Sequence, residues 1–165
     1  MSRTVILKHT AIANKIRRIA YQIYEVNANE KEIIIAGIER KGFVLAERIA
    51  KELKTISNLK VQLCNIKINK KEPLEAIEAS LDSGAYINKS VILVDDVLNS
   101  GSTLMYAVRY FLATPLKQLK TAVLVDRNHK KYPIKVDYKG LSLSTSIQDN
   151  IKVVFSEKGD YAYLE

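Results

Sequence analysis

Two adjacent aspartates followed by small polar residues form the segment of this sequence with the clearest chemical meaning. The run Val91–Leu104 reads VILVDDVLNSGSTL, so an apolar stretch delivers Asp95 and Asp96, and a helical pattern follows the polar residues. Backbone N–H groups, hydroxyls and a glycine at a helix N-terminus form an anion cradle that suits a phosphate monoester. The residues of this cradle are Ser100, Gly101, Ser102 and Thr103.

The two carboxylates would repel a phosphate, so they are expected to contact another part of the ligand. A carboxylate accepts two hydrogen bonds from a cis-diol, which makes ribose hydroxyls the natural partners. A ligand with a 5′-phosphate and free 2′- and 3′-hydroxyls satisfies both halves of the segment. The P-loop and Rossmann patterns are absent from the sequence. An ordinary capped strand–turn–helix explains the segment less well, because paired acids after a buried strand are costly without a purpose.

Segments of helical and strand periodicity alternate along the chain and would position these residues. Helices are expected at Thr10–Val26, with Thr10 as the cap, at Gly42–Leu53 and at Ser102–Leu112. Strands are expected at Glu32–Ile38, Lys60–Ile68, Lys89–Asp95, Thr121–Asp126, Ile134–Tyr138 and Ile151–Phe155, with Tyr161–Leu164 pairing with the last. The alternation predicts an α/β fold: an open, mostly parallel sheet with helices on both faces, in a single domain over residues 1–165.

In such sheets, ligands bind beyond the carboxyl ends of the strands. The loops that follow strands are Glu39–Gly42, Lys67–Lys71, Asp96–Thr103 and Arg127–Lys131, so the chemistry should converge on one edge. The polar stretch Asn69–Asn88 is expected to be a mobile loop with a short helical piece around Leu74–Ala79.

Composition narrows the class of protein without naming a ligand. The formal net charge is +8, which fits either an anion-binding protein or a well-solvated surface. The lysines are spread along the chain, so charge alone favours the solvated surface, and the phosphate cradle shifts the balance toward phosphates but not toward nucleic acid. Cys64, the single cysteine, is expected to be a buried strand residue. No secretory signal or membrane-length apolar run is present, which predicts a cytoplasmic protein without a membrane partner.

The acidic segment resembles the ribose-5-phosphate signature of type I phosphoribosyltransferases. More of the chain resembles one branch, the bifunctional pyrimidine-operon attenuation protein/uracil phosphoribosyltransferase family. Ile35–Leu53, IAGIERKGFVLAERIAKEL, is similar to its diphosphate loop and following helix, and Ala122–Tyr138, AVLVDRNHKKYPIKVDY, to its region after the fourth strand. The opening helix and Ser144–Ser146 also match, so the resemblance covers nearly the whole chain.

The resemblance implies transfer of ribose 5-phosphate from 5-phosphoribosyl-1-diphosphate (PRPP) to a base nitrogen, with Mg²⁺ bridging the diphosphate and the ribose hydroxyls. It implies that Asp95 and Asp96 hold those hydroxyls, directly or through the metal, with Asp95 reaching the metal through ribose or water. It assigns the 5′-phosphate to the cradle and the diphosphate to a loop in which Arg40 and Lys41 neutralise the leaving charge. That loop comprises Glu39, Arg40, Lys41 and Gly42 and is expected to contain a cis peptide near Glu39–Arg40.

The residue at position 99 bears on the acceptor base. In 6-oxopurine members of the family the matching position is an aspartate that interacts with the purine ring nitrogen, whereas Asn99 cannot act as that base at neutral pH. The acceptor is therefore expected to be a pyrimidine, uracil, giving UMP. It would be read by the Asp126–Lys131 segment, which includes Arg127 and His129, largely through backbone groups. A lone histidine beside two lysines is more often a surface residue than a catalyst.

Two departures from the family pattern leave other functions open. Ser102 stands where the family has a cation, and Ile66–Pro73 reads IKINKKEP where the family has an arginine- and acid-bearing lid, which predicts weakened turnover. The alternatives are a phosphoribosyltransferase-like protein without turnover and a UMP-responsive, RNA-binding regulator of pyrimidine genes. Tyr21 departs from the histidine that this branch tends to carry near RNA. The RNA surface would include Arg17, Arg18, Lys130 and Lys135.

The resemblance also implies a homo-oligomer.

Overall fold

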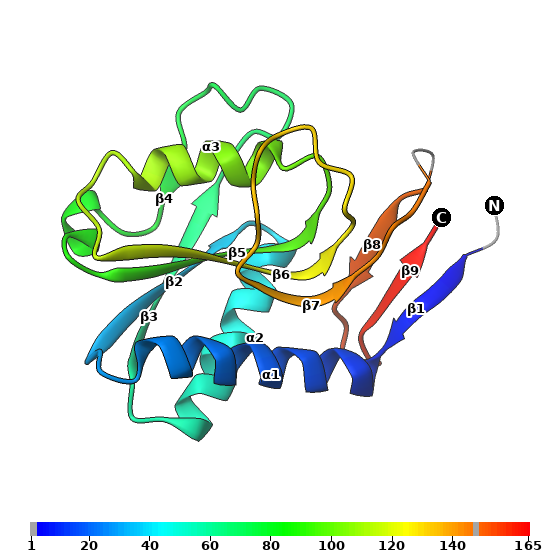
Figure 1. Ribbon diagram of the computed structural model, residues 1–165, viewed down its shortest axis with the longest axis horizontal. Helices are drawn as coiled ribbons and strands as arrows, with labels where there is room; N and C mark the ends of the chain where they lie inside the picture. The colour runs from blue at the N-terminus through cyan, green and yellow to red at the C-terminus, as the bar shows by residue number, and fades with distance from the viewer. Residues whose placement is uncertain (1–2, 147–148) are drawn as a thin grey trace.

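A six-stranded sheet organises the chain in this computed structural model, which describes residues 3–146 and 149–165 (Figure 1). The helices are α1 (His9–Asn27), α2 (Lys41–Ile56) and α3 (Ser102–Phe111), with a 3-10 turn at Ser83–Tyr86. The strands are β1 (Thr4–Lys8), β2 (Glu32–Ile38), β3 (Lys60–Lys67), β4 (Glu78–Ala79), β5 (Ser90–Leu98), β6 (Gln118–Asp126), β7 (Tyr138–Ser142), β8 (Ile151–Val154) and β9 (Tyr161–Leu164).

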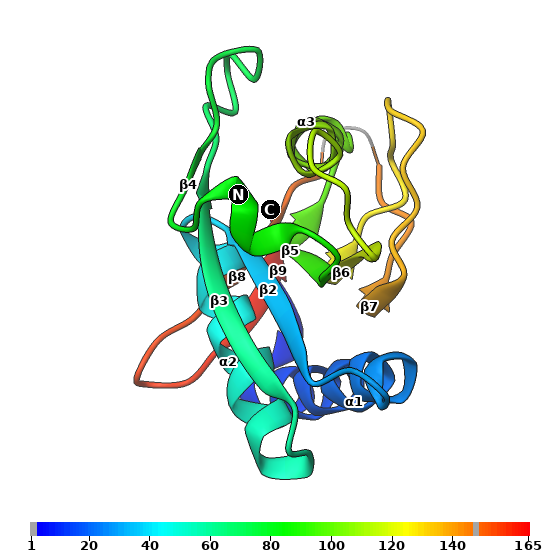
Figure 2. The same ribbon diagram turned by 90° about the vertical axis from the view of Figure 1, so that its left-hand side faces the viewer.

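The main sheet has the order β4-β3-β2-β5-β6-β7, and every pair in it is parallel except β3 with β4. Figures 1 and 2 show α1 and α2 on one face of the sheet and α3 on the other. Each face therefore has its own apolar core, and the central strands β2 and β5 are buried along almost their whole length. The predicted α/β fold, an open and mostly parallel sheet with helices on both faces, is confirmed.

A second, antiparallel sheet of the order β1-β9-β8 lies beside the carboxyl ends of the main strands (Figure 1). The predicted pairing of Tyr161–Leu164 with the preceding strand is confirmed. Strand β1 was not predicted, because a five-residue strand at a sheet edge leaves only a short apolar pattern. None of the helices in the described ranges is long and apolar enough to cross a membrane.

Several predicted boundaries are wrong for identifiable reasons. Strand β5 continues three residues beyond Asp95, because its parallel pairing with β6 extends to Leu98. The strand predicted at Ile134–Tyr138 is instead β7 at Tyr138–Ser142. Ile134 and Val136 alternate because they pack as a loop into the core beneath α3. Helix α1 begins at His9, before the predicted cap, and has no side-chain cap hydrogen bond.

The segment between β3 and β5 also differs from its prediction. It contains no helix around Leu74–Ala79; instead Glu78 and Ala79 pair with Lys67 and Ile66 as the short edge strand β4. The apolar residues Ile77, Ala79 and Leu81 recur at every second position and pack against the core beneath α3, which is a strand-like pattern. Cys64 is fully buried on β3, as predicted.

Candidate active site

Two carboxylates lie near the carboxyl end of β5, and the structure treats them differently. Asp95 is 4% exposed, whereas Asp96 is half-buried. The N–H of Asp96 donates to Oδ1 of Asp95 over 2.9 Å. Burial raises the pKa of Asp95 to about 7, and the charge of Asp96 adds to that effect while the Lys70 ammonium opposes it. The site therefore contains an acid that titrates near neutral pH.

The loop after β2 is brought against these acids by a close backbone approach. Strand β2 pairs with β5, and the N–H of Glu39 donates to the carbonyl of Ile66 on β3 over 2.9 Å. Helix α2 then begins so close to β5 that a Cβ on Gly42 would lie 2.9 Å from the Val94 carbonyl oxygen and 3.1 Å from Oδ1 of Asp95. Only glycine permits this approach. The Glu39–Arg40 peptide is cis, as the resemblance implied.

A pocket of ≈440 Å³ opens between this loop and the end of β5. It unites residues from four separate segments of the sequence: the loop after β2, the loop after β3, the end of β5 and strand β8. Cationic and anionic groups share its walls, so it suits a multiply charged ligand bound through both phosphate and hydroxyl groups. Its lining residues are Glu39, Arg40, Lys41, Ile68, Lys70, Asp96, Val97, Asn99, Ile151 and Lys152.

The turn between β5 and α3 has the conformation expected of an anion cradle. Gly101 has a φ of 87°, in the region that favours glycine, and a Cβ there would lie 2.6 Å from the Ile134 side chain. The N–H groups of Lys131 and Tyr132 donate to the carbonyl of Ser100 over 2.8 and 3.1 Å, which fixes the turn from outside. Helix α3 then begins at Ser102.

A small cavity of ≈90 Å³ lies inside this turn and adjoins the buried acid. Three of the four predicted cradle residues line it, whereas Ser102 lines a separate cavity with Tyr106 and Tyr132. The cavity is therefore small, polar and placed at a helix N-terminus, as a phosphate group requires. Its lining residues are Lys70, Asp95, Val97, Leu98, Asn99, Ser100, Gly101, Thr103 and Leu104.

The segment after β6 is held by its own side chains. Burial alone would raise the pKa of Asp126, but the Asn128 N–H at 3.0 Å and the ammonium groups of Lys139 and Lys130, at 3.0 and 3.6 Å, hold that pKa below its usual value. Arg127 donates through Nε to the Thr145 hydroxyl over 2.8 Å. The Asp126 and Arg127 side chains thus position this segment.

Backbone hydrogen bonds place that segment beside the cradle. The N–H of Arg127 donates to the carbonyl of Leu98 over 3.0 Å, immediately before Asn99. The guanidinium also donates through Nη2 to the carbonyl of Ser146 over 2.9 Å. His129 is half-buried in the loop that follows. The third predicted site segment therefore lies next to the other two at the same edge of the sheet.

The acids, the cradle and the cationic loop all lie within a stretch of the chain that matches one protein family. The family model described as phosphoribosyl transferase domain matches residues 2–161. The chain belongs to the phosphoribosyltransferase family. Among its relatives, this phosphoribosyltransferase is 34% identical over 163 residues to the bifunctional protein PyrR of Streptococcus thermophilus, covering 95% of this chain and 92% of the relative. It is 34% identical over 165 residues to the bifunctional protein PyrR of Clostridium novyi, covering 94% and 92%.

Solved structures confirm the phosphoribosyltransferase fold. A hypoxanthine-guanine phosphoribosyltransferase from Bacillus anthracis superimposes with a TM-score of 0.73 at 21% identity, covering 87% of this chain and 85% of that chain. A hypoxanthine phosphoribosyltransferase from Trypanosoma cruzi gives a TM-score of 0.73 at 18% identity, covering 85% and 81%. The expected resemblance is therefore confirmed for family and fold.

Two lysines of this phosphoribosyltransferase enter the site without having been predicted as site residues. Lys70 stands in the altered loop after β3 and lines the cavities on both sides of the acids. The lysine-rich loop after a strand, in which Lys70 lies, was a signal in the sequence from which this site residue could have been predicted. Lys152 reaches the pocket from β8, where it alternates with the buried Ile151 and Val153. No local pattern distinguishes it from an ordinary exposed strand residue.

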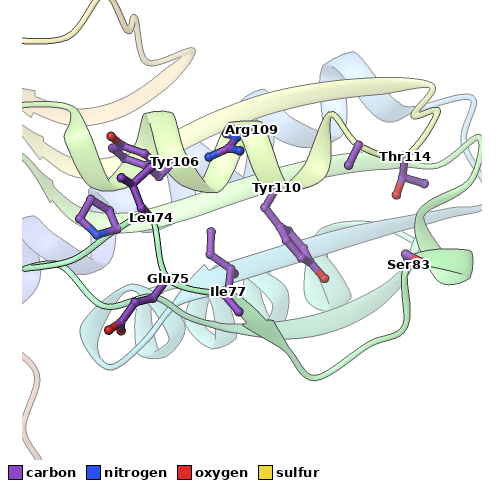
Figure 3. Close-up of a pocket in the computed structure, with 11 residues that line it drawn as sticks. Leu74, Glu75, Ile77, Ser83, Tyr106, Arg109, Tyr110 and Thr114 are labelled. Atoms are coloured by element: carbon purple, nitrogen blue, oxygen red, sulfur yellow. The ribbon is translucent and has the colours of Figure 1, made fainter.

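A further pocket, of ≈330 Å³, lies on the outer side of α3, away from the acids. Figure 3 shows Tyr106 and Tyr110 projecting from α3 toward Leu74 and Ile77 of the segment before β4. Its walls are mainly apolar, in contrast to the charged pocket beside Asp96.

Proposed function

We propose that this protein transfers ribose 5-phosphate from PRPP to the pyrimidine base uracil, giving UMP and diphosphate in the cytoplasm. The observation that carries the proposal is the adjacency of two cavities at the end of β5. One is a small phosphate-sized cavity inside the cradle, and the other is a charged pocket between the acids and the loop after β2. Asp95 and Asp96 stand where a ribose between two phosphate sites would present its hydroxyls.

The chain's own residues would act mainly by positioning and electrostatics. The backbone N–H groups of Ser100–Thr103 hold the 5′-phosphate, and Asp95 and Asp96 accept hydrogen bonds from the ribose hydroxyls. Arg40 and Lys41, at the positive end of α2, neutralise the charge that develops on the leaving diphosphate. These groups surround a sugar that becomes oxocarbenium-like as its bond to diphosphate breaks and its bond to the base nitrogen forms. The proton on that nitrogen passes to solvent.

The acids present fit a magnesium ion that arrives with the donor. Among residues 3–146 and 149–165, no cluster of three or more His, Cys, Asp or Glu side chains could hold a metal without help. Mg²⁺ usually takes one or two protein carboxylates together with substrate phosphates. Glu39 and Asp96 line the larger pocket and would hold the ion, and Asp95, which lines the smaller cavity, would act through ribose or water. Held there, the ion would supply positive charge against the diphosphate as it leaves.

The acceptor assignment rests on position 99 and on the segment after β6. Asn99 lines both cavities. It offers an amide at the position where members of the family that act on 6-oxopurines have an aspartate. The Asp126 and Arg127 side chains hold their segment in place, so its backbone groups are the ones offered to a base edge. Uracil has a donor and acceptor edge that such backbone groups match.

A radiolabelled-base assay with PRPP and Mg²⁺ against uracil, cytosine, hypoxanthine and guanine tests this proposal. The expected result is incorporation of uracil alone, lost in the double variant Asp95→Asn with Asp96→Asn. Turnover of hypoxanthine without uracil would remove the acceptor assignment but leave the transferase. PRPP binding by calorimetry without any turnover would identify a donor-binding protein that has lost catalysis, in line with the altered loop Ile66–Pro73.

A second candidate function, the regulation through RNA that the family resemblance implies, is favoured by one basic surface. Arg17 and Arg18 are both exposed on α1. Arg18 donates to the carbonyls of Lys139 and Gly140 over 3.0 and 2.8 Å, which ties this basic face to β7. A gel shift with pyrimidine-operon leader RNA, with and without UMP, tests it. Binding that is insensitive to salt or sequence would remove the regulator.

The resemblance also leads us to propose that the protein is a homo-oligomer. Light scattering after size-exclusion chromatography would give the mass in solution. A mass equal to that of one 165-residue chain would remove this part of the proposal.

A further inference from the structure

One wall of the charged pocket beside Asp96 is formed by β8. This strand belongs to the small antiparallel sheet β1-β9-β8 and not to the six-stranded main sheet. Strand β8 contributes Ile151 and Lys152 to the same cavity as Arg40, Lys41 and Lys70. Because Ile151 and Val153 point into the apolar core, Lys152 lies on the opposite face of β8. Lysine residues thus line the pocket from β8 as well as from the loops after β2 and β3.

The ammonium of Lys152 is held by Glu165, the residue that follows β9. Lys152 forms an ion pair with Oε1 of Glu165, and Oε2 of that carboxylate lies 3.8 Å from Nε of Arg3. Hydrogen bonding to Lys152 holds the pKa of Glu165 below its usual value. Backbone bonds between Asn150 and Glu165, of 2.8 and 3.0 Å, fix the carboxylate next to β8. Half of the Lys152 side chain remains exposed, so a ligand has access to it.

The small sheet is also fastened to the helix that carries the cationic loop. Asp160, before β9, is 3% exposed and accepts two hydrogen bonds from the Arg48 guanidinium, one of them 3.0 Å long. The Arg48 guanidinium stacks over the Phe155 ring at 4.6 Å. Since Arg48 lies on α2, the strand that carries Lys152 and the helix that follows Arg40 and Lys41 form one connected body. The distance across the pocket is therefore fixed by the fold.

We propose that Lys152 is a further binding residue for the diphosphate of PRPP, and that Glu165 holds its ammonium until the diphosphate displaces the carboxylate. This inference rests on the proposed function and deepens it by naming a residue outside the family motifs. A diphosphate carries more charge than one carboxylate, and it would meet cations on both sides of the pocket. A nucleoside monophosphate lacks the diphosphate, so its binding should not depend on Lys152.

Titration calorimetry in the presence of Mg²⁺ tests this on three ligands: PRPP, inorganic diphosphate and UMP. Lys152→Ala should weaken PRPP and diphosphate binding by roughly three- to five-fold, the upper part of the range for a partly exposed ion pair, and leave UMP binding unchanged. Lys152→Arg should restore the affinity. Lys158→Ala, in the exposed turn between β8 and β9, removes the same charge from the same hairpin and serves as the matched control. Glu165→Gln should tighten diphosphate binding, because the Lys152 ammonium then has no ion pair with a carboxylate to give up when the diphosphate binds.

The outcomes separate this inference from the proposed function. If the wild-type protein binds PRPP and Lys152→Ala binds it equally well, the inference is overturned and the transferase stands. Equal weakening of UMP and diphosphate binding by Lys152→Ala, or weakening of diphosphate binding by Glu165→Gln, would reveal a purely structural pair and would also overturn it. If the wild-type protein binds neither PRPP nor diphosphate, both proposals fail.

Discussion

The buried acid of the site makes a prediction about stability that does not require a substrate. Asp95→Asn replaces a carboxylate that is 4% exposed with a neutral amide of the same shape. The amide oxygen can still accept the hydrogen bond from the Asp96 N–H. The substitution therefore removes the ionisation of one buried group and leaves packing nearly unchanged.

The magnitude follows from the shift in the pKa of Asp95, from an ordinary value of 3.8 to about 7. Because the folded protein holds this proton more tightly than the unfolded chain, the contribution to stability is fully present below 3.8 and is lost as the pH rises through about 7. Ionising the group in the fold costs about 4 kcal/mol in total. About 2 kcal/mol of that difference falls between about pH 5.5 and about pH 8.

Urea unfolding followed by far-ultraviolet circular dichroism, which suits a chain without tryptophan, measures this difference. The free energy of unfolding of Asp95→Asn, relative to the wild type, should rise by about 2 kcal/mol from about pH 5.5 to about pH 8. Glu32→Gln is the control, because the Lys89 ammonium at 2.9 Å lowers the pKa of Glu32 and its difference should stay flat over that range. A flat or falling difference for Asp95→Asn would refute the reasoning and place an ionised Asp95 in the fold.

Three further substitutions test the geometry around the site. Gly42→Ala would place a Cβ 2.9 Å from the Val94 carbonyl oxygen; we expect a loss of about 1–3 kcal/mol in urea unfolding, together with weaker PRPP binding. Gly101→Ala combines a φ of 87° with a 2.6 Å contact to a neighbouring side chain, so it should cost about 1–3 kcal/mol and weaken UMP binding. Asp160→Ala leaves Arg48 without its buried partner and should cost about 3 kcal/mol in the same assay. Retention of wild-type midpoints by any of the three would contradict the corresponding contact.

The main sheet was predictable because its central strands carry unambiguous patterns. The run Glu32–Ile38 is apolar on both faces, and its predicted bounds agree with those of β2. The ends of β5 and the start of β7 were not predictable, because they depend on pairing with β6 and not on local sequence. The apolar residues Ile134 and Val136 alternate with charged residues as they would in a strand, yet their segment is a loop. The alternation arises because both side chains pack into the core on the α3 side of the sheet.

The candidate site was predictable where backbone conformation and chemistry are encoded together. Gly101 needs a positive φ and Gly42 a close approach, and both stand inside motifs that also carry the charged residues. The uneven environments of Asp95 and Asp96 were not visible in the sequence, because burial of one and not the other depends on how α2 meets β5. Lys152 was also invisible, since only the folded small sheet brings β8 to the pocket.

Ser102 and Lys70 together determine where positive charge lies near the cradle. The family has a cation at position 102, whereas this chain has a serine, which lines a cavity other than the ≈90 Å³ one. Lys70 lines that small cavity as well as the larger pocket, and its ammonium lowers the pKa of Asp95 against the effect of burial, so its charge reaches the buried acid. An ammonium is a point charge and does not impose the bidentate geometry of a guanidinium. The proposed function therefore predicts that PRPP binds while turnover is slow, because lysines supply positive charge to this site without the bidentate geometry of arginine.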